Sequence, residues 1–202
     1  MIDVEVIDDP AAAALAVEPV KSRLLAALAE PASAATLAAR LGLPRQKVNY
    51  HLRSLEGHGL VHMSTERRWG GLTERVMMAS ASSYVVSPVA LGPIAADPAR
   101  GSDRLSASYL IALAARIVRE VSTLIRGARN ANKPLATLSI DTEVRFKSAA
   151  DRAAFTKELA DTVMTLVARH HDATTPGGRT HRLVIVAHPL PQQPPQSPSK
   201  KE

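Results

Sequence analysis

A single glycine between two short amphipathic helical patterns is the feature that most constrains the fold of this chain. The first pattern, residues 34–41, follows Ser33, a residue type that caps helix N-termini. Its apolar side consists of Ala35, Leu37, Ala38 and Leu41. Gly42 suits the left-handed conformation in which many helices end. Small alanines on the first helix let a second helix cross it closely, so the pattern predicts a helix-turn-helix.

The second helix of the pair is expected to begin at Pro44 and to run to about His58. Val48, Leu52 and Leu55 recur at helical spacing and are predicted to face the core. The outward-facing stripe that remains consists of Arg45, Gln46, Asn49, Tyr50 and Arg53. Arginine pairs with guanine edges in the major groove of DNA, and asparagine or glutamine pairs with adenine. This stripe is therefore the candidate base-reading surface.

A β-hairpin is predicted after the second helix. Residues 60–65 and 74–81 are extended patterns, and Gly70-Gly71 lies in the segment between them. Two arginines precede the glycines, as expected for the hairpin wing of a DNA-binding head. Trp69 is expected to pack at the base of this hairpin.

Basic residues concentrate in the same part of the chain. The net charge is +6, and residues 40–75 contain seven basic residues against three acidic ones. A basic surface suits a polyanion, because each phosphate contact releases condensed counterions. The candidate phosphate contacts are Lys47, Arg67 and Arg68. An alternative stays open, namely a winged-helix module that binds protein, and steep salt dependence of nucleic-acid affinity would separate the two.

Further helix signals precede the motif. Asp9-Pro10 combines an acidic N-cap with a proline at the first helical position. A second helix is expected from Pro19 to Glu30, with Pro31 ending it. Its predicted apolar stripe consists of Val20, Leu24, Leu25 and Leu28. The first 86 residues are therefore expected to contain several short helices followed by the hairpin.

Residues 37–61, which read LAARLGLPRQKVNYHLRSLEGHGLV, resemble the arsenic-repressor-like (ArsR-type) winged-helix regulators. The matching positions are Val48, His51, Leu52, Leu55, Gly59, Leu60 and Val61. The resemblance implies a homodimer that represses transcription from an imperfect palindrome and often releases it when an effector binds. It also places His51 in the packing of the motif. The chain departs from the family because it lacks cysteines and continues for more than 100 residues past the wing.

Composition predicts four segments. Residues 9–86 form the winged helix-turn-helix head, and residues 87–104, rich in proline and glycine, are interpreted as a linker. Residues 105–188 return to strong periodicity and are assigned to dimerisation, with a small-molecule effector as a candidate ligand. Residues 189–202 are rich in Pro, Gln and Ser and are predicted to be a disordered tail.

The strongest helical pattern of the chain covers residues 103–128. Its apolar face is wide enough to need partners on more than one side, which favours a helix pair in a homodimer. The predicted dimerisation residues are Leu110, Ala114, Ile117, Val121 and Leu124. The alternative is a core helix that packs only within its own chain.

The last part of the chain predicts a strand–helix–strand unit. Apolar and polar residues alternate from Leu138 to Phe146, as in a half-buried strand, and residues 183–187 are uniformly apolar, as in a buried one. A helix is expected between them from about Ala149 to His171, with an apolar side composed of Phe155, Leu159, Val163, Leu166 and Val167. Tyr84-Val-Val is a candidate third strand. The predicted fold class is α+β, mostly helical.

The sequence contains no pattern typical of an active site, so we expect a non-enzymatic protein without a cofactor. Histidines 170, 171, 181 and 188 with Asp172 form a weak metal-ligand pattern. A helix C-terminus favours His170 and His171 without a metal, so no metal site is predicted. No apolar stretch is long enough to span a membrane, and the acidic N-terminus does not resemble a signal peptide. The expected location is the cytoplasm.

Overall fold

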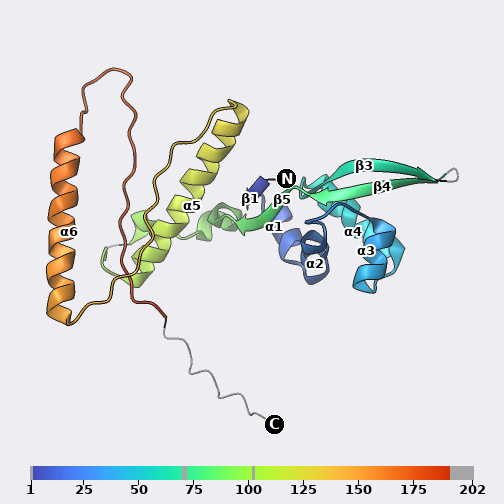
Figure 1. Ribbon diagram of the computed structural model, residues 1–202, viewed down its shortest axis with the longest axis horizontal. Coiled ribbons are helices and arrows are strands. Elements are labelled where there is room, and N and C mark those ends of the chain that lie inside the picture. Colours follow the sequence, from blue (N-terminus) through green and yellow to red (C-terminus); the bar gives the residue numbers. More distant parts are fainter. Residues whose placement is uncertain (1, 70–71, 102, 192–202) are drawn as a thin grey trace, which may run out of the picture. The chain divides into compact units, whose positions relative to one another are not determined.

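The computed structural model describes residues 2–69, 72–101 and 103–191 (Figure 1). The chain divides into two compact units, Met1–Leu135 and Ala136–Glu202, which are considered separately. Both helices and strands are present, which confirms the predicted α+β class with its helical motif, hairpin and long helix.

Four short helices and five strands form the body of the first unit. The helices are α1 (Pro10–Val17), α2 (Pro19–Ala27), α3 (Ala34–Leu41) and α4 (Arg45–Gly57). The strands are β1 (Ile2–Ile7), β2 (Ala32–Ser33), β3 (Val61–Trp69), β4 (Leu72–Ala79) and β5 (Ala81–Val86). Two 3-10 helices, η1 (Pro88–Ile94) and η2 (Pro98–Arg100), then lead to the long helix α5 (Ala107–Asn130).

Capping contacts confirm the predicted helix starts at Asp9 and Ser33 and the predicted helix end at Gly42, whereas α2, expected to run to Glu30, ends at Ala27. The Asp9 carboxylate accepts the backbone N–H of Ala12 at 2.8 Å, and the Ser33 hydroxyl accepts that of Thr36 at 3.2 Å. Each bond satisfies a donor that has no partner within its own helix. Gly42 ends α3 with φ +65°, in the left-handed region that glycine adopts without steric cost. Local sequence signals therefore set the angle at which α4 leaves α3.

Two small sheets complete the first unit. Strands β3 and β4 form the predicted antiparallel hairpin, and β2 pairs with the other edge of β4. Strand β1, which the sequence did not predict, pairs in parallel with β5 from Ile2 opposite Ala81 to Ile7 opposite Val86. The prediction that Tyr84-Val-Val would add to the C-terminal unit is wrong, because this strand pairs with the N-terminal segment.

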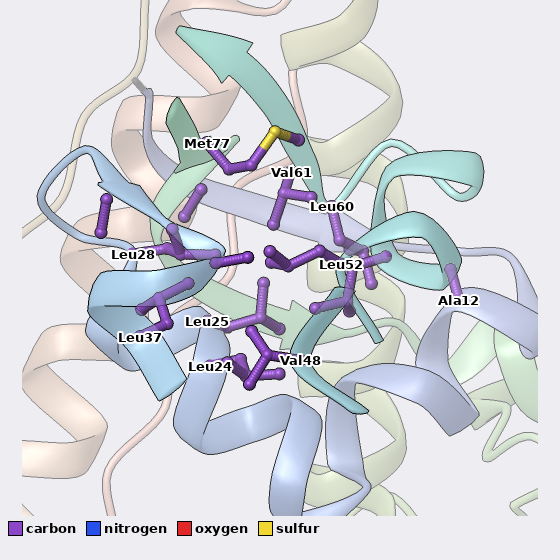
Figure 2. Packing of buried hydrophobic residues seen from close by; sticks show 14 of the residues in the cluster. Ala12, Leu24, Leu25, Leu28, Leu37, Val48, Leu52, Leu60, Val61 and Met77 are labelled. Atoms are coloured by element: carbon purple, nitrogen blue, oxygen red, sulfur yellow. The ribbon is translucent and has the colours of Figure 1, made fainter. Parts of the chain in front are cut away.

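One hydrophobic core connects the helices to the hairpin (Figure 2). Leu24, Leu28, Leu37, Val48 and Leu55 are fully buried in it. They come from α2, α3 and α4 and from the turn that follows α2, so the three helices of the motif share a single core. The predicted inward face of α4 is confirmed, because Leu52 is also buried, at 5% exposure.

Helix α5 belongs to the first unit, which differs from the domain boundary predicted in residues 87–104. The reason is that these residues form η1 and η2, and both contact α5. Arg126 of α5 pairs with Asp8 at 2.5 Å, and Arg129 donates to the carbonyl of Val4 at 3.5 Å. The described part of the proline- and glycine-rich segment therefore contacts α5, although most of its side chains are exposed.

The predicted dimerisation residues lie on the side of α5 that faces away from these contacts. Ala112 and Ser122, the buried residues of α5, lie on the side that carries Arg126. Leu110, Ala114, Ile117, Val121 and Leu124 fall on the opposite side, within an arc of about 80° at 3.6 residues per turn. Ala114, Ile117 (36%) and Leu124 (52%) are exposed, whereas Leu110 and Val121 are half-buried, so this apolar strip is only partly covered in the single chain.

The described part of the second unit contains one helix, α6 (Ala149–His170), which Ser148 caps through the N–H of Asp151. The predicted strands at residues 138–146 and 183–187 are absent from the part of this unit that the structure describes. Leu138 and Ile140 are each 83% exposed, and Leu183 is 60% exposed. A strand exists only when a neighbour takes its backbone hydrogen bonds, and neither segment has one within the described chain.

The predicted apolar side of α6 is present but largely uncovered. Leu159 and Val163 are half-buried, whereas Phe155, Leu166 and Val167 are exposed. Phe146 lies against Phe155, with ring centroids 5.3 Å apart. Residues 192–202 of the predicted tail lie outside the described residues, as do Gly70 and Gly71 of the hairpin.

Replacing Leu55 by Ala should lower the free energy of unfolding by about 2–5 kcal/mol, because the truncated side chain leaves a cavity in the shared core. Val17→Ala is the matched control, since Val17 is 68% exposed and should change stability by less than about 0.5 kcal/mol. Urea denaturation of both variants measures the difference. Equal effects at the two positions would contradict the described core.

Candidate nucleic-acid interface

The outer side of α4 carries a continuous polar surface. Arg45, Gln46, Asn49, Tyr50 and Arg53 are all exposed, and these five side chains together line one shallow surface depression. They occupy about 140° of the helix circumference at 3.6 residues per turn. The predicted stripe is thus brought together on one helix face, with Tyr50 70% exposed at its border.

Lys47 is exposed as well but lies outside this depression. The hydrogen bond from Lys21 lowers the pKa of the Glu18 carboxyl at the start of α2, and the Lys47 ammonium contributes a smaller effect in the same direction. The position of Lys47 therefore separates it from the five residues of the stripe. The division into base-reading residues and a phosphate contact stays a prediction.

The inner side of α4 meets two buried polar residues in the core. His51 is 6% exposed and Lys21 of α2 is 5% exposed. Lys21 forms a hydrogen-bonded ion pair with Glu18. Neither ring nitrogen of His51 has a hydrogen-bond partner among the described residues. Burial lowers the pKa of His51, and the nearby Lys21 ammonium lowers it further.

Lys21 and Glu18 were not identified from the sequence. A signal was present, because Lys21, Leu24, Leu25 and Leu28 share the spacing i, i+3, i+4 and i+7 of one helix face. A lysine in such a stripe buries its aliphatic stem and needs a partner for its ammonium group. Glu18, one turn earlier, supplies that partner. By contrast, the packing role inferred for His51 from the family resemblance agrees with its burial.

The hairpin of β3 and β4 projects beyond the helical motif as a wing (Figure 1). Arg67 lies opposite Glu74 and Arg68 opposite Thr73, and both arginines are exposed. The strands continue to Trp69 and Leu72, so the arginines lie within the end of β3. Because adjacent strand residues point to opposite faces, the two guanidinium groups flank the ribbon on its two sides. The packing predicted for the Trp69 side chain lies outside the described residues.

An ion pair connects the wing to the recognition side of the motif. The Arg75 guanidinium on β4 contacts Glu56 of α4 at 2.5 Å. This hydrogen bond raises the pKa of Arg75. Arg75 belongs to the basic cluster of the sequence but is engaged with Glu56, so it is a positioning residue between α4 and the wing.

Metal-binding geometry is absent from the described part of the chain. No three His, Asp or Glu side chains there are grouped as they would be around a metal ion. Asp172 instead accepts hydrogen bonds from Thr175 and Thr174, which hold the pKa of its carboxyl far below the usual range. None of the described helices combines the length and the apolar character that a membrane crossing requires.

A comparison with protein families finds one similarity in this region. The family described as "Helix-turn-helix domain" matches residues 17–64, which run from the end of α1 to the first half of β3. The match covers α2, α3 and α4 and so includes the whole polar stripe. No curated protein matches the chain. The chain therefore carries an N-terminal helix-turn-helix domain followed by a β-hairpin wing.

The buried His51 predicts acid sensitivity of this domain. Because its pKa in the folded state lies below the ordinary value of 6.5, the unfolded chain takes up a proton more readily. The contribution of His51 to stability is therefore complete above about pH 6.5 and is lost as the pH falls below that value. Urea denaturation at pH 7.5 and pH 5.5 should show a smaller loss for His51→Leu than for the unmodified chain.

The control for this experiment is His58→Gln, because His58 is exposed and bonds the Ser54 carbonyl at the end of the same helix. This variant should keep the acid sensitivity of the unmodified chain. If His51→Leu and His58→Gln change the pH dependence equally, burial of His51 is not its source.

Proposed function

We propose that this protein is a sequence-specific DNA-binding transcriptional regulator of the ArsR-like winged-helix type. The observation that carries the proposal is the exposed stripe of Arg45, Gln46, Asn49, Tyr50 and Arg53 on the second helix of a helix-turn-helix domain. Side chains of these types hydrogen-bond to base edges in the major groove, which admits an α-helix. Lys47, Arg67 and Arg68 hold phosphates on either side of it.

In this proposal, the protein acts as a homodimer and represses transcription from a pseudo-palindromic operator. Support comes from the only partly covered apolar strip of α5, whose residues recur at the seven-residue spacing of paired helices. In the dimer, two copies of α4 enter successive major grooves about 34–36 Å apart. Repression and release by a small-molecule effector follow from the family resemblance alone.

We further propose that the protein is not an enzyme and that it acts in the cytoplasm.

The competing function, a winged-helix module that binds protein, uses the same fold without a preference for base sequence. Salt dependence separates the two, because phosphate contacts release counterions in proportion to their number. The test is binding of the purified protein to the DNA upstream of its own gene and to a scrambled duplex of equal length. Selective binding that weakens steeply with salt supports the regulator, and equal or absent binding contradicts it.

Truncating an arginine of the stripe and truncating an arginine of the wing should change DNA binding in different ways. Arg53→Ala should cost about 1–3 kcal/mol on the preferred operator and relax the sequence preference, because a base contact is lost. Arg67→Ala should weaken binding to all duplexes alike and reduce the salt slope by about 1, because a phosphate contact is lost. Fluorescence anisotropy at several salt concentrations measures both effects.

Arg152→Ala is the matched control for these arginines, since Arg152 is exposed on α6 and outside the helix-turn-helix domain. It should bind DNA as the unmodified chain does. The division into base and phosphate contacts fails if Arg53→Ala and Arg67→Ala lose affinity equally on every duplex.

The α5 strip predicts the oligomeric state. Leu124→Asp should shift the protein from dimer to monomer, because it places a charge in the apolar contact. Thr123→Asp is the control, since Thr123 is exposed on a different side of α5 and should leave the dimer intact. Sedimentation equilibrium measures the change. A dimer whose dissociation constant is unchanged by Leu124→Asp would remove α5 from the interface.

A further inference from the structure

The second unit leaves almost all of its apolar side chains uncovered. None of its described residues is buried, and Phe146, Leu159, Val163 and Val184 are its half-buried ones. Val144 is 52% exposed, and Ile185 is 48% exposed. A chain segment keeps one conformation only when burial outweighs the entropy of ordering it. The uncovered side chains therefore require a partner surface.

Residues 138–147 have the pattern of a strand whose partner is missing. Leu138, Ile140, Val144 and Phe146 alternate with polar residues, yet the segment forms no strand in the described structure. Its backbone donors and acceptors can pair with another extended chain. The alternating pattern therefore indicates a strand with an unpaired edge. The charges on its polar side indicate which second strand can pair with that edge.

The polar side of this segment is acidic in its first half and basic in its second. In chain order, the charged residues are Asp141, Glu143, Arg145 and Lys147. None of these four side chains forms an ion pair in the described structure. Such a sequence is complementary to its own reverse. Two copies that run antiparallel can therefore place every acidic residue opposite a basic one.

Only one antiparallel register satisfies all four charges. With Val144 opposite the second copy's Val144, Asp141 lies opposite Lys147 and Glu143 lies opposite Arg145. Moving the centre to residue 143 or to residue 145 places two like charges directly opposite each other, which is destabilising. A parallel pairing in register also places like charges side by side. Shifting one strand by a single residue relative to the other places the polar side of one copy opposite the apolar side of the second copy.

We propose that residues 141–147 pair with the same residues of a second copy of this chain as antiparallel strands centred on Val144. Val144 of the two copies then meets on the apolar face, with Thr142 opposite Phe146 on either side. The inference rests on the homodimer of the proposed function and names a second surface through which that dimer forms. It also accounts for a strand pattern that has no partner within the described chain.

Single cysteines test this register cleanly, because the chain contains none of its own. Val144→Cys brings the two thiols to directly opposite positions, with Cβ atoms about 4.5–5.5 Å apart, within reach of a disulfide. In the Thr142→Cys control, the two thiols lie four residues apart along the strands, about 13 Å. Under mild oxidation of the full chain, the Val144→Cys variant should form the covalent dimer at least about tenfold faster than the Thr142→Cys variant. Equal rates, or no covalent dimer from Val144→Cys, would overturn the proposal.

Charge reversal provides a second measurement. Glu143→Arg and Arg145→Glu, each combined with Val144→Cys, place like charges opposite each other and should slow the crosslinking of either chain. Mixing the two chains restores opposite charges at both positions, so heterodimers should dominate the covalent product by mass spectrometry. A statistical mixture of products would overturn the register, and a folding defect in a single chain would not be repaired by mixing.

The reduced Val144→Cys chain is also tested for binding to the upstream DNA duplex, which separates the two proposals. Selective DNA binding without fast crosslinking overturns the strand pairing and leaves the regulator intact. Fast crosslinking in a chain that does not prefer its upstream DNA overturns the regulator and leaves the strand pairing intact.

Discussion

Burial of the inner face of α4 is the interaction on which the rest of this structure depends. Val48 and Leu55 are fully buried in the core that α4 shares with α2 and α3, and their burial determines which side chains of α4 point outward. At 3.6 residues per turn, fixing one face of a helix fixes the other. The exposed stripe is therefore a consequence of apolar packing. Its polar residues contribute little to that packing and are free to bind a ligand.

Polar groups within the same core make its packing more specific. Lys21 of α2 and His51 of α4 are both buried, and they would bring two positive charges together if the histidine were protonated. The ion pair with Glu18 offsets part of the cost of burying Lys21. The Arg75–Glu56 contact connects α4 to the wing that follows it. The position of α4 relative to the wing thus depends on an ion pair as well as on apolar packing.

The sequence predicted features whose causes are local and missed those whose causes are distant. The helix starts at Asp9 and Ser33 and the helix end at Gly42 were predictable, because capping depends on neighbouring residues. Strand β1 was not, because its partner β5 lies more than 70 residues away in the chain. The apolar stripe of α2 was identified without Lys21, since a search for apolar residues passes over a buried lysine. For α4, the exposed stripe was identified completely, because helical periodicity alone separates its two faces.

The C-terminal segments show the limit of strand prediction from a single chain. Alternation of apolar and polar residues predicts that one face of a strand is buried. It does not identify the chain that buries that face. For α4 and the β3–β4 hairpin the covering elements belong to the same chain, and the pattern and the structure agree. In residues 138–147, Phe146 packs against Phe155 of α6, whereas Leu138, Ile140 and Val144 stay exposed, and the order of charges is complementary to its own reverse. The same alternation therefore encodes intramolecular packing in one part of the protein and, by our inference, self-association in the other.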